Sequence, residues 1–188
     1  MADSVVYVAA GNRRWQGAVA RDPTVLNSPR QLLFPENFVP HSSVMLRRDV
    51  ALEVGGYTEG MSHVQDLDLL VRMLERGTGV VAPVVGAIYH AHEDQRSLDR
   101  AHMRVAHRSV IEKYRDRPWW TERLLKAWDG VCAWDDARFA LREGKKIEAL
   151  RGLARLMTDP VRLSAVTRLL VWRRQGRRRL SELPAELC

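Results

Sequence analysis

A single delimited helix between residues 62 and 77 constrains the fold more than any other stretch of the chain. Four apolar residues recur at intervals of three and four and predict one buried helical stripe: Leu67, Leu70, Val71 and Leu74. Ser62 followed by Gln65 is a capping-box pattern, which predicts a helix start near His63. Gly77 is suited to the end of the helix. Asp66 then lies in the first turn on another face, where the helix dipole stabilises an ionised carboxylate.

Short apolar runs before and after this helix predict strands, and therefore an α/β region. Strands are expected at residues 4–10, 42–47, 80–82 and 84–90, with Pro83 marking a bend or an edge. Residues 13–37 contain three prolines and little periodicity, which predicts a long loop with a short helix near 31–34. Further helices are expected at 49–54, capped by Asp49, and after Ser97, where four residues share a face: Met103, Ala106, Val110 and Tyr114.

The chain beyond Arg115 is predicted to be helical. Pro118 and Gly130 act as breaks between helices expected at 119–127, 131–142, 145–157 and 161–174. Gly144 between the second and third of these predicts a helical hairpin. The change in composition at 115–118 divides the chain into an α/β domain, residues 1–115, and an all-α extension, residues 116–188.

The charge of the chain favours an anionic partner. The 188 residues include 30 Lys and Arg against 23 Asp and Glu, a formal net charge of +7. Two cysteines give no disulfide framework, and no apolar run approaches the ~20 residues of a membrane span. A cytoplasmic location follows as the expectation, either free or peripheral to the inner face of the membrane.

The basic segment 161–179 has two interpretations. Apolar residues interleaved with arginines suit a helix on an anionic membrane surface. The same pattern suits a core-packing helix with a solvated basic end, which is the favoured interpretation. Nucleic-acid binding is not favoured, because no known binding motif accompanies the charge.

Several motifs in residues 4–97 occur in a particular order. They comprise Asn37, the run 43–48, Val54-Gly55-Gly56-Tyr57, Gln65-Asp66-Leu67-Asp68-Leu69, Arg72, Gly77, the run Tyr89-His90-Ala91-His92, and Ser97. In this order and spacing the segment resembles the acceptor-side half of a family 2 glycosyltransferase, of the A-type nucleotide-sugar transferase fold. The resemblance implies a partial mixed sheet for this half and does not extend beyond about Tyr114.

The resemblance implies a role for each candidate site residue. Asp66 matches the catalytic base, which takes the proton of an acceptor hydroxyl during inverting transfer from a nucleotide-sugar donor. Gln65, Arg47 and Asp68 are candidate substrate-binding residues, and His92 is a candidate metal ligand, favoured over His90. Gln65 departs from the Glu that the family commonly has there. Asp66 and Asp68 cannot share an ion, because residues two apart on a helix point about 200° apart.

The donor side of the family is not found in this sequence. The resemblance implies a divalent metal, Mn²⁺ or Mg²⁺, held by an Asp-x-Asp motif in a half that would precede Ser4, where only three residues stand. We therefore expect a glycan or lipid-linked acceptor on this chain and a donor-binding half from a partner chain or a longer reading frame. The alternative is a non-catalytic transferase module that acts in binding or scaffolding, including at an anionic membrane surface.

Overall fold

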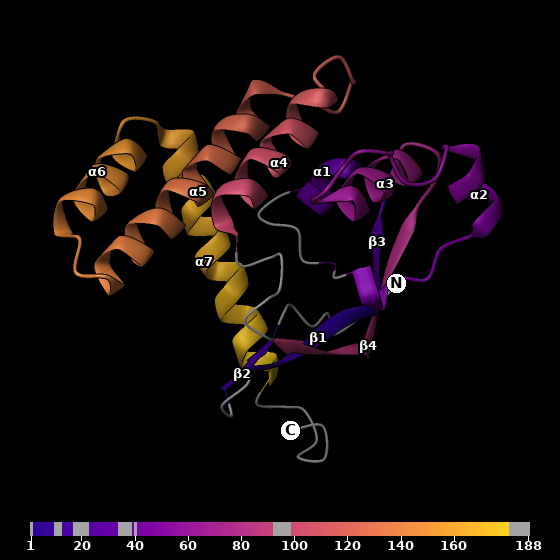
Figure 1. The fold of residues 1–188 in the computed structure, drawn as a ribbon, viewed down its shortest axis with the longest axis horizontal. Coiled ribbons are helices and arrows are strands. Elements are labelled where there is room, and N and C mark those ends of the chain that lie inside the picture. The colour runs from indigo at the N-terminus through magenta and orange to yellow at the C-terminus, as the bar shows by residue number, and fades with distance from the viewer. Residues whose placement is uncertain are drawn as a thin grey trace.

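The small sheet of the chain is mixed. The computed structural model describes residues 2–9, 13–16, 23–33, 39, 41–91 and 99–180. Within them, β1 (Ala2–Ala9), β2 (Arg13–Gln16), β3 (Thr24–Leu26) and β4 (Gly79–Ala91) form a four-stranded sheet of order β2-β1-β4-β3. The central pair β1 and β4 is parallel, with Tyr7 opposite Tyr89, and the outer strands pair antiparallel to it. The predicted mixed sheet is therefore observed (Figure 1).

The strand predictions hold in part. β4 runs through Pro83 without a break, but its register against β1 shifts between Ala82 and Val85, so the predicted bend is present as an irregularity. The predicted loop at 13–37 is wrong in part, because β2 and β3 lie within it. The predicted strand at 42–47 is also wrong: a 3-10 turn η1 (His41–Ser43) is followed by residues without regular structure. An apolar run alone does not make a strand where no neighbouring strand is available for pairing.

Four helices connect and cover the sheet region. They are α1 (Pro29–Leu33), α2 (Arg48–Glu53), α3 (Gln65–Leu74) and α4 (Arg100–Lys113). Asp49 does not cap α2; it pairs with Arg47 instead. Ser97 lies outside the described residues, and the cap of α4 is Asp99, whose side chain accepts a hydrogen bond from His102 N at 3.1 Å.

The start of α3 differs from the predicted capping box. The helix begins at Gln65, and its N-cap is Val64 in the left-handed conformation, with φ 53° and ψ 23°. The N-cap makes no side-chain hydrogen bond to the helix, and the Ser62 hydroxyl lies 2.9 Å from His63 Nδ1. A buried β-branched residue with positive φ is strained by about 1 to 3 kcal/mol. The surrounding packing therefore fixes the direction in which the chain enters α3.

The predicted buried stripe of α3 is confirmed and forms the centre of the main core. Its four apolar residues are 0 to 6 % exposed. They pack with buried side chains of β3, α1, β4 and α4. Val110 and Tyr114 of α4 are buried in the same cluster, with Met103 and Ala106 packed against it, so the predicted face of α4 is confirmed as well.

The C-terminal part of the chain is a helical hairpin followed by a long helix. These elements are α5 (Glu122–Arg142), α6 (Lys146–Met157) and α7 (Pro160–Leu180). The hairpin turn contains Gly144 with φ +76°, and Lys145 N donates to Ala140 O at 2.8 Å, as in a Schellman motif. The predicted hairpin is therefore observed. Figure 1 shows α7 crossing behind α5 and reaching β2 with its C-terminal half.

Gly130 does not break a helix, contrary to the prediction. α5 continues through it, because α5 and α7 approach closely there: a Cβ on Gly130 would lie 2.7 Å from Arg162 Cα. Leu169 and Ala165 of α7 are almost fully buried against α5. The core-packing interpretation of the basic segment is thus confirmed for Ala165, Val166 and Leu169, whereas Leu163, Leu170 and Val171 are 37 to 51 % exposed.

The predicted boundary at residues 115–118 coincides with the turn between α4 and α5. The main core nevertheless extends across this turn, because Leu124 and Leu125 of α5 belong to it and Trp119 and Trp120 pack against it. The structure is therefore helix-rich with one small mixed sheet, and its helical part is packed onto the α/β part. In the described ranges, no helix is long and apolar enough to cross a membrane.

Candidate active site at the start of α3

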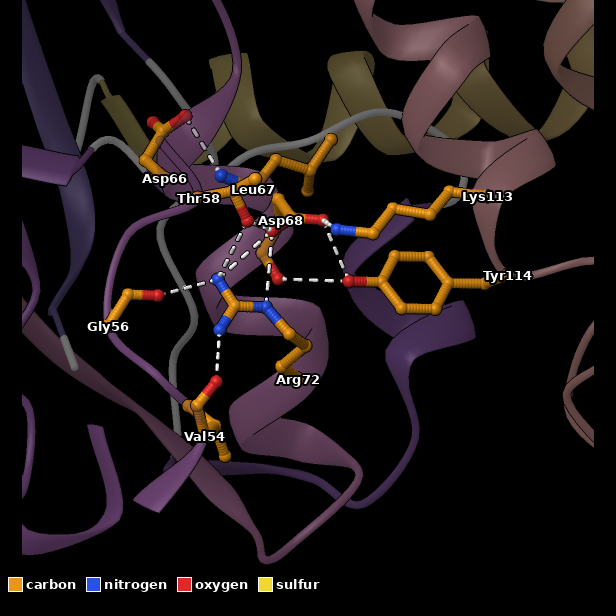
Figure 2. A network of polar contacts seen from close by, with 9 residues as sticks. All are labelled: Val54, Gly56, Thr58, Asp66, Leu67, Asp68, Arg72, Lys113 and Tyr114. Carbon is orange, nitrogen blue, oxygen red and sulfur yellow. Dashed lines mark hydrogen bonds and ion pairs between the residues drawn. The ribbon is translucent and has the colours of Figure 1, made fainter. Parts of the chain in front are cut away.

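Asp68 is the centre of a polar network that holds the start of α3 (Figure 2). Its side chain is 0 % exposed. Oδ1 accepts hydrogen bonds from Lys113 Nζ at 2.7 Å and Tyr114 Oη at 2.8 Å, both at the end of α4. Oδ2 accepts from Thr58 Oγ1 at 2.7 Å and from Arg72 Nη2 at 3.0 Å. Both carboxylate oxygens are therefore satisfied by the protein itself.

The network keeps Asp68 ionised despite its burial. Burial alone would raise the pKa of Asp68, but hydrogen bonds from Lys113, Thr58 and Tyr114 and the charge of Lys113 together lower it below its ordinary value. Burial and the adjacent carboxylate raise the pKa of Tyr114, so its phenol remains a donor. The Asp68 carboxylate therefore connects α3 to α4 and to the preceding loop, and the substrate contact expected of it stays a prediction.

Arg72 extends the network to the loop after α2. Its guanidinium donates to the backbone carbonyls of Val54 and Gly56, the latter at 2.6 Å. Gly55 and Gly56 have φ of +86° and +66°, and Gly56 N bonds back to Ala51 O at 2.8 Å to close α2. Arg72 thereby holds the loop that precedes the helix start in one position.

Asp66 faces away from this network. Figure 2 shows its carboxylate pointing in a different direction from that of Asp68, as predicted for residues two apart on a helix. The residue is partly exposed, and its Oδ1 accepts the Leu67 N–H at 2.9 Å. Among the described residues Oδ2 has no hydrogen-bond partner. Asp66 is therefore an oriented carboxylate with one oxygen available to a bound molecule.

The negative charge of Asp66 reaches one histidine of α4, and another histidine of α4 stacks on the segment that leads into α3. His107 of α4 is partly buried, and its Nδ1 donates to Met103 O at 2.8 Å. Burial lowers the pKa of His107, opposed by the hydrogen bond to Met103 and by the negative charge of Asp66. His63 stacks on His102 with ring centroids 5.9 Å apart and planes at 12°. α4 thus packs beside the start of α3, which sequence spacing did not reveal.

Among the described residues, no side-chain hydrogen bond or ion pair joins Asp66 to Arg47 or Gln65. Gln65 is adjacent in the chain and partly exposed at the first position of α3. The Arg47 side chain is 77 % exposed and pairs with Asp49, two residues further along the chain. His92 lies outside the described residues; β4 ends at Ala91, one residue before it. The roles of Gln65, Arg47 and His92 stay predictions.

The described residues do not fit a divalent metal. No group of three or more His, Cys, Asp or Glu side chains converges among them. The two carboxylates of α3 diverge, and Asp68 is fully occupied by its protein partners. We therefore assign no step to a metal held by these residues.

A cysteine nucleophile is also not indicated. Burial raises the pKa of Cys132 to about 12, with neighbouring acids adding to the effect, so its thiol is protonated at neutral pH. The strongest candidate for proton transfer in the described part of the chain is Asp66.

No model of a known protein family, no curated protein and no solved structure matches the chain.

Proposed function

We propose that the chain is the acceptor-side half of an inverting glycosyltransferase, in which Asp66 is the catalytic base. The observation that carries the proposal is the contrast between the two acids of α3. Asp68 is buried and bonded to four side chains, whereas Asp66 is partly exposed and keeps one oxygen without a partner in the described part of the chain. The helix start thus presents a carboxylate with one oxygen that is unpaired among the described residues, which suits a base.

The proposed reaction is a single displacement. The acceptor hydroxyl attacks the anomeric carbon of a nucleotide sugar and loses its proton to Asp66 Oδ2. The new bond forms between the acceptor oxygen and the anomeric carbon, while the bond to the nucleoside diphosphate breaks and its electron pair leaves with the diphosphate. The nucleotide-sugar donor binds to the donor-side half of the transferase, which the motifs of residues 4–97 do not cover.

An add-back assay tests this function. The purified chain is added to membranes from its own cells after the native gene has been deleted, together with UDP-, GDP- and dTDP-sugars and Mn²⁺ or Mg²⁺. Release of nucleoside diphosphate and incorporation of labelled sugar are measured. We expect the wild-type chain to restore incorporation from one donor. Incorporation that is unchanged by the added chain would contradict the proposal.

Non-catalytic binding is a second candidate, favoured by the outer face of α6. Three large apolar side chains form one stripe there and are 65 to 75 % exposed: Ile147, Leu150 and Met157. Small residues face inward instead, with Ala149 and Gly152 buried against α5. An apolar stripe of this kind is typical of an interaction surface. Sedimentation of the chain as a monodisperse monomer, unchanged by Leu150→Arg, would count against self-association through α6.

A further inference from the structure

Three arginines from separate elements converge on one pocket. The pocket has a volume of about 190 Å³ and lies between α1, α5 and α7. Arg30 comes from α1, Arg123 from the first turn of α5, and Arg168 from the middle of α7. Arg30 Nη2 also lies 3.4 Å from Thr121 Oγ1, the cap of α5, which connects α1 to this end of the helical part.

The charge of this pocket is not neutralised by the described residues. No acidic residue lines it. Two acids close in sequence to lining residues are paired elsewhere: Glu122 with Arg115 at 2.9 Å, and Asp159 with Lys126 at 3.3 Å. Arginine is protonated at all physiological pH values, and its planar fork of donors matches phosphate oxygens. The pocket is therefore a site for a strong anion.

The remaining wall of the pocket is apolar. Leu124, Ala127 and Ala165 line it and are each at most 7 % exposed, and the Ser164 side chain adds one hydroxyl. The volume corresponds to roughly six water molecules at ~30 Å³ each, which is enough for a phosphate or diphosphate and the first carbons of a substituent. A nucleotide enclosed by the pocket would need a larger volume.

We propose that this pocket binds the phosphate or diphosphate of an ester whose organic part is apolar. The three guanidinium groups bind the phosphate oxygens, and the first carbons of the ester lie against the apolar wall. The ester can come from a soluble molecule or from a lipid headgroup in a membrane. The site is independent of Asp66 and extends the function proposed above.

Calorimetry with defined probes tests the proposal. The full chain is titrated at low salt with inorganic pyrophosphate, octyl phosphate and octyl glucoside, and vesicles of phosphatidylcholine with or without phosphatidic acid are floated with it. The pocket variant carries Arg123→Gln and Arg168→Gln. The matched control carries Arg151→Gln and Arg174→Gln, two exposed arginines outside the pocket with the same change in charge.

We expect octyl phosphate to bind more tightly than pyrophosphate and octyl glucoside not to bind. The pocket variant should weaken octyl phosphate binding by about tenfold or more, and the control by less than about twofold. If flotation requires both phosphatidic acid and the pocket arginines, the phosphate ester is a lipid headgroup. If octyl phosphate binds but the chain does not float with the vesicles, the ester is a soluble molecule. Equal losses in both variants, or no binding of either phosphate probe, would overturn the proposal.

Discussion

Asp68 Oδ1 lies 2.7 Å from Lys113 Nζ, and this ion pair joins the first turn of α3 to the last residue of α4. The same oxygen accepts the Tyr114 hydroxyl, and the other oxygen accepts Arg72 and Thr58. The carboxylate therefore connects two helices and a loop that are distant in the sequence. The position of Asp66, two residues earlier, depends on this connection.

Asp68→Ala should destabilise the chain strongly. The substitution removes the carboxylate partner of the partly buried Arg72 and the side-chain acceptor of the buried Tyr114 hydroxyl, which costs about 3 kcal/mol of unfolding free energy. Asp66→Ala is the matched control, and its cost should stay at about 1 kcal/mol, since one hydrogen bond from Leu67 N–H at a partly exposed site and a favourable interaction with the helix dipole are lost. Urea denaturation of both variants measures the difference. Equal losses would contradict the separate roles of the two acids.

The stability of the chain should depend on pH through Asp68. Its pKa is lowered from 3.8 in the folded state, so the ionised form contributes stability that is present above the unfolded value. This contribution is lost as the pH falls through 3.8 toward the lower folded pKa. Wild-type unfolding free energy should therefore fall more steeply below about pH 5 than that of Asp68→Asn. Parallel profiles for the two proteins would show that Asp68 is not responsible.

Removing the charge of Asp66 should change the pKa of His107. Burial lowers the pKa of His107 from 6.5, and the negative charge of Asp66 partly opposes this effect. Asp66→Asn should therefore lower the pKa of His107 further, because the opposing charge is removed. An NMR titration of the histidine ring protons measures the shift, with Asp116→Asn, an exposed acid after α4, as control. An unchanged pKa in Asp66→Asn would mean that the two side chains are not neighbours.

Gly130→Ala should separate α5 from α7. The added Cβ would lie 2.7 Å from Arg162 Cα and 2.8 Å from its carbonyl oxygen, so one helix must move. The cost should be about 1 to 3 kcal/mol of unfolding free energy, as for other overpacked positions. Gly77→Ala is the control: nothing lies within 4 Å of its added Cβ, and a gain of up to about 1 kcal/mol is expected. Thermal denaturation compares the stability of the two variants. A Gly130→Ala variant as stable as the wild type would contradict the close approach of α5 and α7.

Structural predictions from the sequence were most accurate where an apolar pattern repeats within one helix. The period of Leu67, Leu70 and Leu74 identified the buried stripe of α3, and the face of α4 was found in the same way. The helix start was misplaced because Val64 adopts a left-handed conformation that no local pattern signals. β3, with three residues, was too short to show a periodicity.

The partners of the candidate site could not be predicted, because they are distant in the sequence. Lys113 and Tyr114 lie 45 and 46 residues after Asp68, and nothing in the motif around Asp68 indicates them. The sequence therefore indicated a substrate-binding role for Asp68 but not the four protein side chains that bond to its carboxylate. Gly130 was likewise interpreted as a break, because sequence alone does not show that a second helix crosses there.

The most direct test of the account is sugar transfer by Asp66→Asn in the add-back assay. The variant keeps the shape of the side chain but cannot accept the acceptor proton, and Asp116→Asn controls for the loss of a charge. We predict that Asp66→Asn lowers incorporation by about 100-fold or more while Asp116→Asn restores it as the wild type does. Full incorporation with Asp66→Asn would contradict the assignment of Asp66 as the base.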